Sequence, residues 1–181
     1  MVIRVSRFNL YLALALAGLC GCQSPAHKSK KVKSTFRVHQ EANAGPQGDT
    51  REIAVGREHP VKFTVQKQPF LTEGNVKSAK VVDALGGFAL SVEFDRQGRW
   101  LLEQYTVGSG GRHFAIFSQF TPPQEDKLNQ GRWLAAPRIS QRISDGVLLF
   151  TVDASRAEAE QIALGLNNVA RKTHDGEESK W

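Results

Sequence analysis

The chain has 181 residues, with 24 lysines and arginines against 18 acidic residues and a formal net charge of +6. This length suits one folded domain with a sizeable core plus a tether. Much of the basic excess lies near the amino terminus, in Arg4, Arg7, Lys28, Lys30, Lys31 and Lys33. The remainder is close to neutral, so the sequence lacks the concentrated basic face that is typical of nucleic-acid binding.

Residues 1–21 have the layout of a lipoprotein signal peptide. Two arginines provide a positive start, residues 8–19 form an apolar stretch, and Gly21 is the small residue before Cys22. The apolar stretch is shorter than the roughly 20 residues that a membrane-spanning helix requires. We therefore expect cleavage before Cys22 and attachment of lipid, including palmitate, to Cys22.

The same processing accounts for both cysteines of the chain. Cleavage removes Cys20, and the lipid occupies Cys22. No thiol then remains for a disulfide, a metal ion or catalysis, so packing alone must stabilise the domain.

Residues 22–59 are polar, and prolines and glycines interrupt any periodic pattern. We predict that they form a lipidated, flexible tether that is basic near its start. Its lysines suit anionic lipid headgroups, at roughly 1 kcal/mol for each basic residue, and suit a solvated run of charge equally well. Two patches, residues 35–38 and 52–55, are compatible with one short strand each.

The folded domain is expected over residues 60–172. Residues 61–66 alternate apolar and polar side chains, which predicts a half-buried strand. Thr72 is a good cap for a helix whose apolar residues follow at helical spacing until Gly86-Gly87 ends it. Residues 88–94 show the cleanest alternation in the chain and predict a second strand.

The second half is predicted to contain a turn, a short helix, a strand, a loop, an edge segment and a further strand. In that order they cover residues 95–98, 100–105, 113–117, 121–131, 133–139 and 147–152. Ser155 and Glu158 then form an S-x-x-E capping box that opens the last helix. A polar tail, residues 173–181, follows that helix.

The connections between the last strands are too short for helical crossovers, so these strands must pair partly antiparallel. We predict an α+β domain of two layers. Its sheet is mixed or antiparallel, its helices lie on one face, and its character is ferredoxin-like.

No arrangement of residues predicts catalysis. The histidines His27, His39, His59, His113 and His174 are scattered, and none stands at ligand spacing from another histidine or a carboxylate. His113 lies in a predicted strand among apolar residues, which favours a structural role. We therefore predict no enzyme, no cofactor and no metal site.

A series of spaced motifs runs from residue 71 to residue 166. They are Leu71-Thr72, the set Gly98, Leu102 and Thr106, the stretch Gly111–Ile116, the element Ala136–Ile139, the turn Ile143–Gly146, and the helix Ala157–Leu166. In this order they resemble the head subdomain of the first periplasmic domain of SecD, a membrane subunit that assists protein export. Three features differ from that family: Ser118-Gln119 stands where an acidic residue is usual, residues 121–132 look like an insertion, and Phe150-Thr151-Val152 replaces an Ile-Thr-Gly.

The resemblance implies a non-catalytic domain that binds polypeptide segments or assists protein export. The lipid would hold it in the cell envelope facing the periplasm, with the outer membrane favoured because no aspartate follows Cys22. The alternative is a scaffold lipoprotein with one fixed protein partner. We expect a binding surface along the edge segment Trp133, Leu134, Ala135, Ala136, Pro137, Arg138 and Ile139, although packing in or over the core is an alternative for Trp100 and Trp133.

Overall fold

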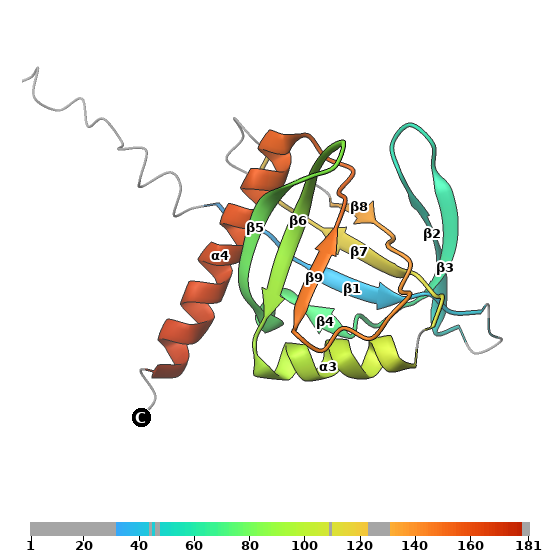
Figure 1. Ribbon diagram of the computed structural model, residues 1–181, viewed down its shortest axis with the longest axis horizontal. Helices are drawn as coiled ribbons and strands as arrows, with labels where there is room; N and C mark the ends of the chain where they lie inside the picture. Colours follow the sequence, from blue (N-terminus) through green and yellow to red (C-terminus); the bar gives the residue numbers. More distant parts are fainter. Residues whose placement is uncertain (1–31, 44, 46–47, 109, 123–130, 179–181) are drawn as a thin grey trace, which may run out of the picture. The chain divides into compact units, whose positions relative to one another are not determined.

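Antiparallel strand pairs form three separate sheets in the computed structural model of the protein (Figure 1). The structure describes residues 32–43, 45, 48–108, 110–122 and 131–178. The predicted signal peptide, Cys22 and most of the predicted loop 121–131 lie outside the described residues. Within the described residues, no helix is long and apolar enough to cross a membrane.

The largest sheet has the order β4-β1-β7-β8. Its strands are β1 (Arg37–Gln40), β4 (Leu71–Thr72), β7 (Phe114–Ser118) and β8 (Arg132–Ala135). A three-stranded sheet of order β5-β6-β9 contains β5 (Val76–Ala84), β6 (Gly87–Phe94) and β9 (Val147–Phe150). A separate hairpin pairs β2 (Thr50–Val55) with β3 (Val61–Gln66).

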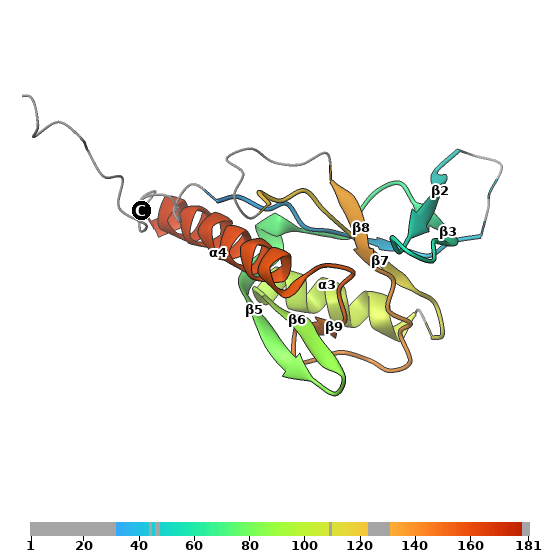
Figure 2. The same cartoon turned by 90° about the horizontal axis from the view of Figure 1, so that it is seen from above.

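Both larger sheets contribute to one core, together with the helices α3 (Arg96–Val107) and α4 (Arg156–Glu178). Figure 2 shows β5, β6 and β9 in the lower part of the view and β7 and β8 above them, with α4 on the left. The fully buried side chains include Phe36, Leu90, Leu102, Ile116 and Leu166. The α+β class and the antiparallel pairing are confirmed, whereas the single expected sheet is divided into three.

The helix expected after Thr72 is wrong. Only one 3₁₀ turn, η2 (Glu73–Asn75), forms there, and β5 follows it directly. The chain returns through Gly86, whose φ of +81° suits a tight turn, and β6 pairs with β5 along its length. Pairing across this hairpin outweighs the helical spacing of a few valines and alanines, because valine also suits a strand.

Two predicted boundaries are also wrong. Residues 22–59 are not a tether throughout, because β1 is paired on both sides by β4 and β7 and β2 is paired with β3. Both strands overlap the two patches, residues 35–38 and 52–55, that the sequence marks as compatible with a short strand, and their sheet partners stabilise them. The predicted polar tail begins inside α4, which continues to Glu178.

The predicted turn at residues 95–98 is the start of α3. Asp95 accepts a hydrogen bond from the Gly98 backbone N–H at 2.7 Å and thus caps the helix. Gly98, Leu102 and Thr106 form the buried stripe of α3. A Cβ atom on Gly98 would lie 2.9 Å from the Cβ atoms of Asn75 and Phe94, so this close approach requires glycine.

The last helix begins as predicted. The Ser155 backbone N–H donates to the Glu158 carboxylate at 2.8 Å, and the Glu158 backbone N–H donates to Ser155 Oγ at 3.2 Å. This reciprocal pair is the capping box expected from the sequence. It fixes the start of α4 at the point where the chain leaves the three-stranded sheet.

Asn167 of α4 closes the outer edge of β5. Its side-chain amide donates to the Ala79 carbonyl and accepts from the Ala79 N–H, both at 2.8 Å. These two bonds replace those that a neighbouring strand would make. The edge of β5 is therefore occupied by a side chain of the same protein.

We expect Asn167→Ala to lower the free energy of unfolding by about 1–3 kcal/mol, because it leaves a partly buried N–H and C=O of Ala79 without partners. Asn167→Asp, which keeps only the acceptor, should fall between that variant and the wild type. Chemical denaturation monitored by circular dichroism measures the change. Glu160→Ala, on an exposed position of α4, is the control; equal stability of all four proteins would contradict the role of Asn167.

Candidate functional site

The predicted edge segment 133–139 does not form one continuous surface. Leu134 is fully buried and Ala135 and Ile139 are nearly so, because they belong to the core. Trp133, Ala136 and Pro137 are half-buried, and Arg138 is exposed. The structure thus divides the seven residues between the core and a partly open face.

Four of the seven residues, Leu134, Ala135, Ala136 and Pro137, line a groove of about 310 Å³, whereas Trp133 and Arg138 do not. Its walls come from the tip of the β2-β3 hairpin, from β8 and the residues after it, and from the chain that leaves β9. They comprise Val55, Gly56, Leu134, Ala135, Ala136, Pro137, Thr151, Val152 and Asp153. The sequence therefore indicated one wall of this groove and missed the other two.

The groove lies where the two larger sheets meet. β8 is at one edge of its sheet, and β9 is at one edge of the other. The Asp153 backbone N–H donates to the Leu134 carbonyl at 2.8 Å and joins the β8 edge to the chain that leaves β9. Apolar side chains and backbone groups of two strand ends thus border the same hollow.

Ion pairs connect the hairpin tip to the chain around the groove. Arg57 Nε lies 3.1 Å from Asp153, and Arg57 also lies 3.8 Å from the Glu158 carboxylate. Arg132 contacts the other oxygen of Glu158 at 3.1 Å. Burial acts to raise the pKa of Glu158, but the hydrogen bond from the Ser155 N–H and the nearby arginines outweigh it, so the pKa is lowered.

Trp133 supports the groove from the other face of the large sheet. Its ring packs edge-on against the rings of Phe117 and His39, at 5.3 and 5.2 Å between centroids. Arg51 of β2 lies 5.0 Å above the same ring. Trp133 also packs with Ile53, Val55 and Val65 in a small second core, which seats the hairpin on the sheet. The tryptophan is thus largely a packing residue.

His39 is buried in this region, with 1% of its surface exposed. Its Nδ1 lies 2.8 Å from the Gln66 carbonyl and must donate, because a carbonyl only accepts. Its Nε2 has no hydrogen-bond partner among the described residues. Burial lowers the pKa of His39 below 6.5, the Gln66 bond opposes this shift, and Arg51 and Arg37 add to it. The ring is therefore neutral near pH 7.

Because folding lowers the pKa of His39, this side chain takes up its proton at a higher pH in the unfolded chain than in the folded chain. We therefore expect the free energy of unfolding to decrease as the pH falls from about 7.5 to about 5.5, by at most ~1.4 kcal/mol per pH unit from this one group. His39→Gln should show a shallower decrease over the same interval. Denaturant titrations at several pH values measure the slope, and His59→Gln, at an exposed position, is the control. An unchanged slope in His39→Gln would contradict this assignment.

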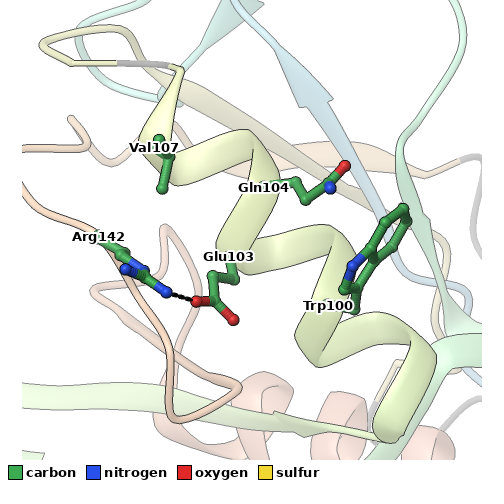
Figure 3. Close-up of a pocket in the computed structure, with 5 residues that line it drawn as sticks. All are labelled: Trp100, Glu103, Gln104, Val107 and Arg142. Carbon is green, nitrogen blue, oxygen red and sulfur yellow. Dashed lines mark hydrogen bonds and ion pairs between the residues drawn. The ribbon is translucent and has the colours of Figure 1, made fainter.

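A second hollow, of about 500 Å³, lies on the exposed side of α3 (Figure 3). Trp100, Glu103, Gln104 and Val107 line it from the helix, and Arg142 pairs with Glu103 across it. Trp100 is 56% exposed and Val107 is 63% exposed. Core packing therefore does not account for Trp100.

His113 forms a pair that the sequence did not predict. Its Nδ1 lies 2.7 Å from Glu41, and its backbone N–H donates to the same carboxylate oxygen at 2.8 Å. Burial acts to raise the pKa of Glu41, but these bonds and the positive charges nearby lower it overall. Glu41 is 72 residues away and lies in the segment predicted to be a tether. In the part of the chain that the structure describes, no three metal-binding side chains come together.

A family model described as "SecDF, P1 head subdomain" matches residues 50–170. The chain belongs to this family. The match spans the hairpin, α3, the part of α4 up to residue 170 and all the walls of the groove. None of the curated proteins matches the chain.

Two solved structures of SecDF share the fold of this SecDF P1 head. The first is described as a membrane component that enhances protein export; it is 20% identical, has a TM-score of 0.50, and is matched over 93% of this chain and 71% of its own. The second is SecDF in a super-membrane-facing form, also 20% identical, with a TM-score of 0.51. That match covers 80% of this chain and 21% of the other, so this chain spans only a small part of that protein.

The structure shows which contacts the motif residues of the SecDF P1 head make. Thr106 donates to the Leu102 carbonyl at 2.8 Å and accepts the Ile143 N–H at 3.0 Å, so it ties α3 to the turn that precedes β9. Gly146 has a φ of +77°, and its carbonyl accepts the Phe94 N–H at 2.9 Å. These motif residues hold the start of β9 in place.

Proposed function

We propose that this protein is a lipid-anchored component of the bacterial cell envelope whose SecDF head domain binds extended polypeptide segments and assists protein export, without catalysis. Membership of the SecDF P1 head family supports the link to export, because one matched SecDF structure is described as enhancing export. The observation that carries the proposal is the groove between the edge strand β8 and the chain that leaves β9. It contributes both apolar side chains and strand backbone.

These are the contacts that suit an extended chain of varied sequence. The half-buried Ala136, Pro137 and Val152 offer apolar contact, and neighbouring backbone offers hydrogen bonds that do not depend on sequence. A shallow groove of this size excludes a folded domain and accommodates a few residues of extended chain. The proposal therefore assigns the groove to segments of unfolded protein.

The lipid anchor rests on the sequence of the first 22 residues. We propose that the chain is cleaved before Cys22, acylated there and retained at a membrane facing the periplasm, the outer membrane in preference to the inner one. Val32, the first described residue, follows Cys22 by ten residues. An extended segment of ten residues spans at most ~36 Å, so the domain would stay close to the lipid surface.

Cys22→Ser should release the protein from the membrane fraction, because no thiol remains at the predicted lipidation site. The measurement is fractionation of cells that make the full chain, with labelling by a palmitate analogue. Cys20→Ser is the matched control and should stay labelled. Labelling of the Cys22→Ser protein would contradict the anchor.

A photoreactive amino acid at Thr151, which is exposed and lines the groove, should cross-link to reduced and carboxymethylated α-lactalbumin, a permanently unfolded protein. It should not cross-link to native α-lactalbumin. The same group at Lys80, an exposed position of β5, is the control. Equal cross-linking from both positions, or none from either, would contradict polypeptide binding in the groove.

A second function is favoured by the hollow on α3. Trp100 and Val107, exposed on the same hollow at opposite ends of the helix stretch that lines it, resemble the anchors that dominate fixed protein interfaces. A scaffold lipoprotein with one tight partner would use this face and ignore unfolded protein. Loss of one discrete complex in Trp100→Ala, without any binding of carboxymethylated α-lactalbumin by the wild type, would favour this alternative.

A further inference from the structure

The outer edge of β9 is open. The Phe94 N–H donates to the Gly146 carbonyl, so in the alternating antiparallel ladder Leu148 and Phe150 bond to β6 while Val147 and Leu149 point their backbone groups away from it. The Asn167 bonds to Ala79 on the far side of the same sheet fit this alternation. Within the described residues, nothing bonds to the outward N–H and C=O of Leu149.

The opposite edge of this sheet is β5, and three features of it prevent another strand from pairing there. Asn167 occupies the backbone of Ala79. Lys77 and Lys80 are exposed on β5, and the ladder is irregular between Val76 and Ser78. Side-chain caps, lysines and bulges are the devices by which native sheets prevent another strand from pairing.

β9 carries no lysine and no bulge, and it has a side-chain cap only at its first residue. Its sequence, Val147–Phe150, contains no charge and no proline. Leu149 is 58% exposed. Only its first outward N–H is occupied, since Val147 donates to Asp145 at 3.0 Å. An apolar edge left open on one side of a sheet whose other side is closed is suited to strand pairing.

The open edge leads directly into the groove. Beyond β9, Thr151, Val152 and Asp153 form one wall, and Asp153 bonds to Leu134 of β8. This hydrogen bond ties β8 to the chain three residues beyond the end of β9. A strand placed beside Leu149 would run toward this hydrogen bond and meet the half-buried side chains of Ala136 and Pro137.

The dimensions favour an extended segment over a second copy of the chain. β9 has four residues with one exposed leucine, which is much less surface than the roughly 1,200 Å² that a stable dimer buries. The β9 strand of a second copy is held in its own sheet, so it has no free chain to place in the groove. A single extended segment uses both the edge and the groove.

We propose that an extended polypeptide segment adds to this sheet as a fourth strand beside β9, with its continuation in the groove; this inference rests on the proposed function. The segments bound are those with apolar, β-branched residues and no proline over about five residues. Affinity comes from backbone hydrogen bonds to Leu149 and the residues around it. The edge segment that the sequence predicts, residues 133–139, thus contributes one wall of the groove. The added strand pairs with β9 instead.

The test uses the full chain and a fluorescent ten-residue peptide of alternating valine and serine, with binding measured by anisotropy. Leu149→Pro removes the outward N–H without removing a bond to β6, and proline is tolerated at such an edge position. We expect it to weaken binding at least tenfold. Leu149→Ala keeps the N–H and should weaken binding less than fivefold.

A second measurement leaves the protein unchanged. Peptides N-methylated at one residue at a time should lose binding at every second position, because alternate N–H groups of the added strand face β9. This series keeps the inference testable if Leu149→Pro fails to fold.

The remaining results would overturn the inference, each in a different way. Binding within threefold of wild type in folded Leu149→Pro, or an N-methyl series without alternation, overturns strand addition and leaves groove binding intact. A dimer of the wild type that Leu149→Pro disrupts and the peptide does not would assign the edge to a second copy and overturn the inference. Failure of the wild type to bind the peptide or carboxymethylated α-lactalbumin overturns the proposed function as well.

Discussion

The packing of Phe36 between the two larger sheets is the contact on which the rest of the structure depends. Its ring lies on the segment before β1 and contacts Phe94 of β6 at 6.1 Å and Phe150 of β9 at 6.4 Å between centroids. A fully buried phenylalanine contributes on the order of 2–3 kcal/mol by burial alone. Because this ring joins sheets that share no strand, it helps hold the large sheet against β6 and β9.

Local polar contacts then fix the ends of the elements around that core. Asp95 starts α3, the Ser155–Glu158 pair starts α4, and Thr106 attaches α3 to the turn before β9. Glu158 has two further roles, since its carboxylate also receives Arg57 and Arg132. A single helix cap thus links the hairpin tip and β8 beside the groove. The surface proposed to bind polypeptide is built on some of the most constrained parts of the fold.

Sequence patterns were reliable where one local signal had no competitor. The alternation of residues 88–94 and the capping box at Ser155 both appear in the structure as expected. The helix predicted after Thr72 is wrong because the valines and alanines there fit both the helical period and the strand period. Only pairing with β6 favours the strand. β1 lies within the predicted tether because a strand of four residues is too short for a clear apolar–polar alternation. Its pairing with β4 and β7 stabilises it. The candidate site was found in part, since the edge segment is one wall, and the walls from Val55 and Thr151 come from distant parts of the chain.

The sequence by itself determined the α+β class, the membership of the SecDF head family, most of the strands and the start of the last helix. These follow from periodicity, capping and motif spacing, which are local properties of the chain. Only the tertiary structure decided the division into three sheets, the pairing of His113 with Glu41, and the contrast between the closed edge of β5 and the open edge of β9. The physical reason is that an edge is defined by which neighbour is absent, and Asn167 reaches Ala79 across 88 residues of sequence. No local pattern contains that information.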